Sequence, residues 1–304
     1  MEFIVPITKL DGMFEFLKTK PKKKMVAAYA NDAHTIDAVS KAIDLEIIEG
    51  ILVGDKSEIE KVCSEESIDI NKFTIIDESN DINATQKAVD IINEGNADFI
   101  MKGMVTSDKY MRVILNKEKG LIPPKAVLSH VTVIENAGYH KLLVISDVAV
   151  IIQPDINQKI AMTNYVIKIA HSLGIEKPKV ALLAATEQTS HKIPACADAA
   201  IISKMADRGQ IKGAFVDGPL ALDVIVDKKS AEIKKVKSEV AGDADCIVFP
   251  NIESGNAFYK FHTKLCGGEL GAIVVGAKVP AVLSSRGDSV KTKLYSIALG
   301  AMNA

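Results

Sequence analysis

The stretch PAVLSSRGDS, residues 280–289, has the residue types and the order expected of an anion-binding site. An apolar strand runs into two serines and Arg286, and Asp288 then begins a helix. A helix N-terminus presents unpaired N–H groups and the positive end of its dipole, and both attract anions. Arg286 adds a planar group that holds a phosphate through two donors, while Gly287 lets the main chain approach a ligand closely. The alternative is that Arg286 forms a surface ion pair and that Asp288 only caps the helix.

A second stretch, MKGMVTSDKY at residues 101–110, has a similar order of strand, glycine and helix start. Its candidate ligands are Lys102, Gly103, Thr106 and Ser107. Ligands of open α/β sheets bind outside the carboxyl ends of the strands, so these residues are candidates for the same cleft as Arg286. The same order also occurs where it has only a structural role.

One further candidate ligand is Ser129, which lies on an expected strand beside His130. His130 is the one histidine that merits attention, because the six histidines form no metal-binding spacing such as H-E-x-x-H. The sequence also lacks the G-x-S-x-G elbow, the G-x-x-x-x-G-K-[ST] loop and the G-x-G-x-x-G fingerprint. These absences argue against serine hydrolases, P-loop NTPases and ordinary Rossmann dehydrogenases.

Three acidic fragments raise the alternative of a divalent metal site. They are Asp217–Asp223, Ala241–Asp245 and Pro250–Lys260. Pairs of aspartates at such spacing occur in metal sites, but they also occur as turn and cap residues at the ends of strands. We favour the second interpretation and expect no bound metal.

The elements that must position these residues follow an α/β pattern. Short β-branched runs alternate with helical patterns along the whole sequence, which predicts a largely parallel sheet. The eleven expected strands cover residues 25–30, 50–53, 73–77, 97–101, 127–134, 141–146, 180–184, 213–216, 246–249, 272–275 and 281–284. Capping residues predict helices that start at Asn31, at Asp155 and at Asp288–Ser289, the second of which ends near Gly174.

The chain has 304 residues, enough for about two domains of ordinary size. Its net charge of −2 gives no general attraction to nucleic acid or to an anionic membrane. There is no secretory signal and no apolar run long enough to span a bilayer. The four cysteines are far apart, which favours reduced thiols over disulfides or a zinc site. The sequence therefore predicts a soluble cytoplasmic protein that binds neither nucleic acid nor membranes.

Three long stretches resemble the phosphate acetyl/butyryltransferase family. They are SKMADRGQIKGAFVDGPLALD at residues 203–223, VAGDADCIVFPNIESGN at 240–256 and VGAKVPAVLSSRGDSVKTKLYSIALG at 275–300. The resemblance extends to MKGMVTSDKY and ISDVAVIIQPD, and it covers nearly the whole chain. The ending SSRGDS…TK…SIAL and the lack of long additional N-terminal domains resemble the butyryl branch, phosphate butyryltransferase, more than the acetyl branch.

The resemblance implies two α/β lobes of the isocitrate/isopropylmalate dehydrogenase-like type, with the active site in the interdomain cleft. It also implies a homodimer as the minimal unit, and a final segment that returns to the first lobe. We therefore expect residues 1–135 with 280–304 in the first lobe and residues 136–279 in the second. The chain is expected to cross between the lobes near residues 130–140 and 275–282.

The implied reaction converts a short-chain acyl-CoA, butyryl-CoA above all, and inorganic phosphate to acyl phosphate and coenzyme A. The reaction is reversible and direct, without a covalent acyl-enzyme, and coenzyme A is a substrate rather than a bound cofactor. Asp288 is the candidate base for the thiol of coenzyme A, whose pKa is about 8.5 when free. Ser285 would hold the sulfur, and Arg286 would bind the phosphoryl oxygens and the developing oxyanion. Lys102, Thr106 and Ser129 are secondary ligands by position.

This sequence departs from the family pattern at three places. Gly287 replaces the alanine that the family commonly has, and Asn251 replaces an aspartate. The acetyl branch has its proposed catalytic aspartate seven residues after the serine, where this chain has Thr292. The role of the base therefore falls on Asp288, although the nearby Arg286 would make that carboxylate a weaker base.

Other functions remain open at this stage. The acyl preference is undecided, since one methylene contributes only ~1–3 kcal/mol to discrimination, and a preference for acetyl-CoA is the first alternative. A metal-dependent dehydrogenase or decarboxylase on the same architecture is the second. The third is a regulatory module that binds coenzyme A or acyl phosphate without turnover.

Overall fold

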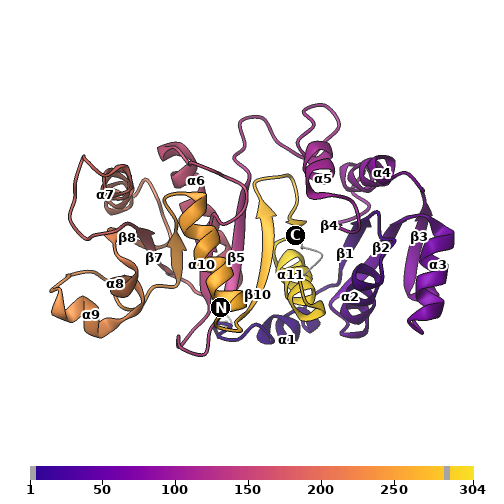
Figure 1. Ribbon diagram of the computed structural model, residues 1–304, viewed down its shortest axis with the longest axis horizontal. Coiled ribbons are helices and arrows are strands. Elements are labelled where there is room, and N and C mark those ends of the chain that lie inside the picture. Colours follow the sequence, from indigo (N-terminus) through magenta and orange to yellow (C-terminus); the bar gives the residue numbers. More distant parts are fainter. Residues whose placement is uncertain (1–4, 284–287) are drawn as a thin grey trace. The chain divides into compact units, whose positions relative to one another are not determined.

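The computed structural model describes residues 5–283 and 288–304, in which strands and helices alternate along the chain (Figure 1). The strands are β1 Lys23–Ala28, β2 Ile48–Gly54, β3 Phe73–Asp77, β4 Phe99–Lys102, β5 Ser129–Glu135, β6 Leu143–Ser146, β7 Lys179–Leu183, β8 Phe215–Leu220, β9 Cys246–Val248, β10 Glu269–Val275 and β11 Ala281–Val282. The helices are α1 Gly12–Lys18, α2 Ala33–Asp44, α3 Lys56–Glu65, α4 Asp81–Asn93, α5 Ser107–Ile114, α6 Ile156–Ser172, α7 Pro194–Asp207, α8 Leu222–Val226, α9 Lys228–Ile233, α10 Ile252–Lys264 and α11 Val290–Asn303. A short 3-10 helix covers Ile70–Lys72.

Each expected strand coincides with one strand of the described structure, with bounds that differ by a few residues. The strand β1 starts at Lys23, before the apolar run, because Lys23 and Lys24 still pair with Ile48 and Glu49 of β2. The prediction of a largely parallel sheet is confirmed, since β5–β6 and β10–β11 are the antiparallel pairs among the described pairings.

The contacts along the chain divide it into two compact units. Unit 1 contains the described residues up to Leu10 and Ser129–Leu270, and unit 2 contains Asp11–Leu128 and Gly271–Ala304. Each unit is formed by two separate segments of the chain. The expected lobes, residues 1–135 with 280–304 and residues 136–279, stay a prediction about domains.

The sheet of unit 2 has the strand order β3-β2-β1-β4-β11-β10. Helices α4 and α5 pack together on one face, while α1, α2 and α11 pack together on the other (Figure 1). The centre of the sheet is apolar on both faces, as expected of parallel strands, and Met25–Ala28 of β1 is fully buried. Lys102, the last residue of β4, is buried as well, which makes the end of this strand unusual.

The sheet of unit 1 has the strand order β5-β6-β9-β7-β8. The last four strands run parallel to one another, whereas β5 runs antiparallel to β6. The start of β5 therefore lies at the edge where the other four strands end. Helix α6 packs on β6 and β9, and its N-cap Asp155 forms a capping box with Gln158, as the sequence predicts for a helix that starts there.

Polar caps begin the helices that follow the strands of unit 2. Asp32 caps α2 through Thr35, one residue later than expected, because the side chain of Asn31 instead accepts a hydrogen bond from the main chain of Asp55. Ser289 caps α11 through the N–H of Thr292, as the sequence predicts. Among the described residues, no helix combines the length and the apolar character that a bilayer crossing needs.

Candidate functional site

Strands β1, β4 and β11 of unit 2 are parallel neighbours that end at the same edge of the sheet. Lys102 lies beside Ala28, and Val282 lies beside Met101, so the segments after β4 and β11 leave the sheet next to each other. The order of connections reverses at β1, which has β2 on one side and β4 on the other. Open α/β sheets bind their ligands at such a reversal, so this edge is the candidate functional site.

Three predicted site residues, Ser285, Arg286 and Gly287, lie outside the described residues. The described residues on either side of them are Leu283, just after β11, and Asp288, just before the N-cap of α11. Both belong to the edge defined above. The catalytic roles of Ser285 and Arg286 therefore stay predictions.

Lys102 has a structural task that the sequence did not reveal. Its side chain is buried, and its ammonium Nζ donates to the carbonyl oxygens of Gly103 at 3.1 Å and Val105 at 3.0 Å. These bonds fold the segment after β4 around the ammonium group. Lys102 therefore gives this segment a fixed shape and places a positive charge at the edge of the sheet.

Gly103 lies at a close approach of two main-chain segments. A β-carbon at this position would be 2.5 Å from the carbonyl oxygen of Tyr29 and 2.8 Å from that of Ala28. The N–H of Gly103 donates to Ala28, and the N–H of Met104 donates to Tyr29. The glycine is therefore needed for packing, and its own N–H is already bonded to β1.

Thr106 and Ser107 lie at the start of α5. Thr106 is the N-cap residue, and its hydroxyl lies 3.5 Å from the N–H of Lys109, a long capping bond. Both side chains are exposed, so both hydroxyl groups are accessible to a ligand. One turn further along, the hydroxyl of Tyr110 is fully buried and has no hydrogen-bond partner among the described residues. Burial raises the pKa of Tyr110, so the phenol stays protonated.

Asp288 is half-buried and directly precedes the N-cap of α11. Its carbonyl oxygen accepts a hydrogen bond from Nζ of Lys293 at 3.2 Å. Lys293 is buried inside the first turns of α11, although no sequence motif indicated it. The first turn of α11 contains no acidic side chain, so the dipole of this helix leaves a positive partial charge at its start.

In unit 1, Ser129 belongs to a buried network around Asp147. The hydroxyl of Ser129 lies 2.8 Å from that of Ser146 and donates to Oδ2 of Asp147 at 2.9 Å. The same carboxylate also accepts hydrogen bonds from the main-chain N–H groups of His130, Ala149 and Val150. Four hydrogen bonds compensate for the burial of this charge. Ser129 therefore has a structural function here, and its role as a substrate ligand stays a prediction.

His130 is held at the same edge of unit 1. Asp147 binds its main-chain N–H, and the ring Nδ1 lies 3.2 Å from the hydroxyl of Thr132. Residues two apart on a strand share one face, which explains why the ring and the hydroxyl meet. The buried Asp147 network was missed from the sequence, because residues of two antiparallel strands form it.

Aspartates of the first two acidic fragments that suggested a metal site are bonded to lysines and to a main-chain group. Asp243 accepts from Lys179 at 2.6 Å and from Lys141 at 2.9 Å, and Asp223 pairs with Lys234. Asp217 accepts from the N–H of the residue that follows it. Across the described ranges, no cluster of three or more His, Cys, Asp or Glu side chains is arranged to hold a metal ion.

The cysteines are free thiols, and three of them are buried. Burial raises the pKa of Cys63, Cys196 and Cys246, which keeps these thiols protonated and makes them poor nucleophiles. Cys266 is exposed on the loop after α10. The three buried thiols are therefore poor candidates for a covalent intermediate.

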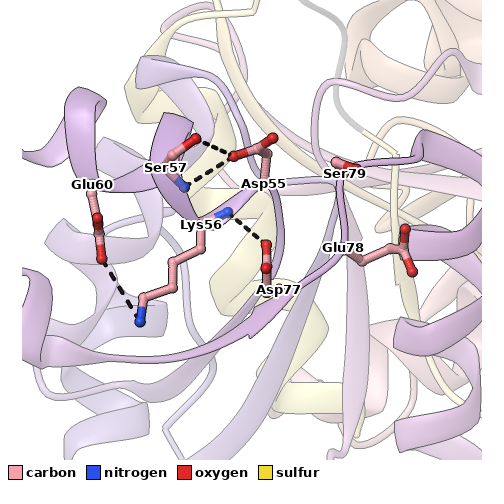
Figure 2. A pocket seen from close by; sticks show the side chains of 7 residues that line it. All are labelled: Asp55, Lys56, Ser57, Glu60, Asp77, Glu78 and Ser79. Carbon is pink, nitrogen blue, oxygen red and sulfur yellow. Dashed lines mark hydrogen bonds and ion pairs between the residues drawn. The ribbon is translucent and has the colours of Figure 1, made fainter.

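A hollow lies elsewhere in unit 2, outside the ends of β2 and β3 (Figure 2). It is lined by Asp55, Lys56, Ser57, Glu60, Asp77, Glu78 and Ser79. Lys56 already pairs with Glu60, and hydrogen bonds from Ser57 and Glu58 lower the pKa of Asp55, which is therefore charged at neutral pH. A region with so many carboxylates repels phosphate, so this hollow does not fit the anion site that the sequence predicts.

The family model described as "Phosphate acetyl/butaryl transferase" matches residues 78–301 of this chain. A phosphate butyryltransferase of Clostridium acetobutylicum is 45% identical over 288 residues, which are 95% of this chain and 95% of that protein. A phosphate acetyltransferase of Thermotoga maritima is 39% identical and covers 97% of this chain and 99% of its own length.

A solved structure shares the fold as well. The crystal structure of a branched-chain phosphotransacylase from Enterococcus faecalis V583 is 28% identical, with a TM-score of 0.80. The match covers 92% of this chain and 98% of that one. The mixed α/β fold with a large sheet is therefore the fold of a phosphotransacylase structure.

Proposed function

This chain belongs to the phosphate acetyl/butyryl transferase family, and on that premise we propose that it transfers a short acyl group between coenzyme A and inorganic phosphate. Butyryl-CoA is the proposed substrate, and the products are butyryl phosphate and coenzyme A. The observation that carries this proposal is the 45% identity, over 95% of the chain, to a phosphate butyryltransferase.

The proposed reaction is a direct displacement at the thioester carbonyl. An oxygen of phosphate forms a bond to the acyl carbon, the carbon–sulfur bond breaks, and the thiolate of coenzyme A takes up a proton. In the reverse direction the thiol must lose that proton. We assign the proton exchange to Asp288, because a carboxylate in hydrogen-bond reach contributes about 10²–10⁴-fold to such a step.

Ser285 and Arg286 complete the proposed catalytic group. Ser285 would donate a hydrogen bond to the sulfur, and Arg286 would bind the phosphoryl oxygens and the oxyanion that develops at the carbonyl. Gly287 would bring the main chain close to the same oxygens. The positive start of α11, which has no acidic side chain in its first turn, supports this assignment of phosphate to Arg286.

Lys102, Thr106 and Ser107 are proposed to contribute to phosphate binding from the start of α5. The exposed hydroxyl groups of Thr106 and Ser107 support direct contact. Lys102 would attract phosphate through its charge. Its hydrogen bonds to the carbonyl oxygens of Gly103 and Val105 would also hold the main chain after β4 in position for the ligand. Ser129 remains the proposed ligand from unit 1.

We further propose two lobes of the isocitrate/isopropylmalate dehydrogenase-like type, a homodimer or higher homo-oligomer, and a cytoplasmic location. The buried, unpaired thiols of Cys63, Cys196 and Cys246 support a reducing compartment. Coenzyme A is proposed as a substrate, with no resident cofactor or metal. Neither nucleic acid nor a membrane is a proposed partner, in keeping with the net charge of −2.

The test of this function follows the release of thiol from butyryl-CoA with a thiol-reactive dye, without added metal. Acetyl-, propionyl- and isobutyryl-CoA run in parallel, each with a control that lacks phosphate. Release that requires phosphate supports the transferase, and the order of the rates gives the acyl preference. Release without phosphate would indicate a thioesterase instead.

A second candidate is a preference for acetyl-CoA, which the 39% identity to a phosphate acetyltransferase favours. The same assay decides between the two, because acetyl-CoA would then give the highest kcat/KM of the series. Binding of coenzyme A without turnover of any substrate would instead support a regulatory module.

A further inference from the structure

Helix α10, which follows β9 in unit 1, buries little of itself within the chain (Figure 1). Of its 13 residues only Gly255 and His262 are buried, whereas α11 buries most of its 14 residues. A helix of this length is only marginally stable in water by itself, and the packing of an apolar face supplies most of its stability in a protein. Helix α10 therefore keeps a surface that packing inside the chain does not use.

This surface carries an apolar stripe. Phe261 is 56% exposed, and Leu265, the C-cap residue of α10, is 76% exposed. Ala257, one turn before Phe261, is exposed as well. Residues four apart lie on one face of a helix, so these three side chains form a continuous row, which we call the α10 stripe. Phe258 instead points inward and packs on Phe249, with 5.5 Å between the ring centroids. Large apolar side chains exposed side by side are typical of an interaction surface.

Two opposite charges border the α10 stripe. Glu253 lies in the first turn of α10 and Lys264 in the last turn, and both side chains are exposed. Glu253 precedes Ala257 of the stripe by four residues. Lys264 follows Phe261 by three residues, so at 3.6 residues per turn both charges lie beside the stripe, along the same edge. The stripe is therefore negative at one end and positive at the other.

A second copy of the chain matches this pattern when its α10 runs in the opposite direction. A two-fold axis across the middle of α10 brings the start of each helix to the end of the other. Glu253 of one copy then lies beside Lys264 of the partner subunit, and the two apolar stripes meet between these pairs. Parallel helices would instead place like charges and like ends of the helix dipoles side by side. The surface is thus complementary to itself in the antiparallel orientation.

We propose that the α10 stripe binds a second copy of this chain, with the two α10 helices antiparallel across a two-fold axis. The proposal rests on the homo-oligomer that forms part of the proposed function, and it names the surface through which that oligomer forms. A two-fold contact uses the same patch on both subunits, so the patch must match itself. An apolar centre with ion pairs at the rim is the usual composition of such an interface.

The experiment measures the molar mass in solution by light scattering and the dissociation constant by sedimentation equilibrium. For the unmodified protein we expect at least twice the 32.7 kDa of one chain. For Phe261→Asp we expect the dissociation constant to rise at least about 10²-fold and the mass to fall by half, because a charge replaces an aromatic anchor at the centre of the contact. The control is Ile233→Asp on α9 of the same unit, where the side chain is 70% exposed, and its mass should not change.

A charge exchange tests the antiparallel orientation. Glu253→Lys and Lys264→Glu each place like charges opposite one another, so we expect either substitution alone to raise the dissociation constant about tenfold. The two substitutions together restore opposite charges, and the dissociation constant should return to within about threefold of the original. A double variant that dissociates more readily than either single variant would overturn the proposed pairing.

An unmodified protein with the mass of one chain would overturn the proposal, and so would a folded Phe261→Asp variant that keeps the full mass. If that variant does not fold, Leu265→Asp replaces it with the same expected result, since Leu265 is still more exposed. The thiol-release assay on the unmodified protein keeps the two proposals apart. An oligomer without turnover would refute the proposed function alone, whereas turnover by a single chain would refute the α10 contact alone.

Discussion

Gly103 lies so close to Tyr29 that a β-carbon at position 103 would be 2.5 Å from the carbonyl oxygen of Tyr29. Tyr29 itself has a φ of 57°, a left-handed conformation that is uncommon for a residue with a side chain. Such conformations persist where surrounding contacts enforce them, and they are frequent at functional sites. The two residues thus form a rigid contact between the ends of β1 and β4, at the edge where we locate the site.

The close contact predicts that Gly103→Ala is damaging. The added carbon would meet main-chain atoms, which cannot turn away as the end of a flexible side chain can, at an expected cost of about 1–3 kcal/mol in the free energy of unfolding. We also expect a lower kcat, since the segment that follows Gly103 would shift. Urea unfolding and the thiol-release assay measure both effects.

The control for this substitution is Gly138→Ala. A β-carbon at position 138 would meet only the side-chain Oδ1 of Asn136, at 3.1 Å, so we expect a change within about 0.5 kcal/mol. An unfolding midpoint of Gly103→Ala equal to that of the control would contradict the close approach at Tyr29.

Ser129→Ala separates the structural role of this serine from a role in substrate binding. The hydroxyl donates to the buried carboxylate of Asp147, so its removal is expected to cost about 1–3 kcal/mol of stability. If Ser129 also binds substrate, as proposed, we expect the KM for phosphate to rise at least about threefold as well. A KM for phosphate within about twofold, in a variant of lowered stability, would contradict Ser129 as a ligand and leave it the structural role inside the network of Ser146 and Asp147.

The lowered pKa of Asp243 predicts how the free energy of unfolding depends on pH. Burial acts to raise the pKa of this carboxyl group, but hydrogen bonds from Lys179, Lys141 and His140 outweigh burial and hold the pKa below its ordinary value. In the unfolded chain the pKa of an aspartate is about 3.9. The charged carboxylate of Asp243 therefore contributes its full stabilisation of the fold above that pH, and the contribution is lost as the pH falls through the lower pKa of the folded state.

The substitution Asp243→Asn tests this network. Because the side chain is 39% exposed, solvent screens its ion pairs, and we expect a loss of only about 1 kcal/mol at neutral pH. The difference in stability between the two proteins should vanish in strong acid, because Asp243 of the original protein is then protonated and as uncharged as the asparagine. Since Asp243 precedes β9, it lies at the opposite end of that strand from the carboxyl edge, and kcat should not change. A difference in the free energy of unfolding that does not change with pH would contradict a stabilising role for the charge of Asp243.

The fold was predictable to the extent that local patterns determine it. Apolar β-branched runs indicated every described strand, and Asp155 and Ser289 indicated the start of α6 and of α11. The burial of Lys293 was not predictable, because a charged side chain in an amphipathic pattern indicates an exposed face. Helix α11 instead buries most of its residues against its neighbours in unit 2.

The candidate site was predictable in part. The order of residues after β4 indicated a ligand site, and the structure places that segment beside the end of β11. The tasks of Lys102 and Ser129 depend on contacts that no local pattern reveals: a side chain that folds back on its own segment, and a serine that meets Ser146 across two antiparallel strands. Burial and pairing of polar groups are properties of the folded chain.

Arg286→Ala is expected to lower kcat/KM for phosphate by at least about 10²-fold, because preorganised donors at a developing oxyanion contribute at this level. The circular dichroism spectrum and the unfolding midpoint should stay unchanged. Arg112→Ala is the control, since the ion pair of Arg112 among the described residues is an exposed one, with Asp108 on the surface of α5. Near-normal kinetics of the Arg286 variant would remove that residue from the proposed site.

Phosphorus NMR of the protein with butyryl-CoA and inorganic phosphate observes both sides of the proposed reaction at once. We expect the phosphate signal to be converted to that of an acyl phosphate at the rate at which free thiol appears. Free thiol without any acyl phosphate, or no change in either signal with a folded protein, would contradict the assignment of this chain as a phosphate acyltransferase.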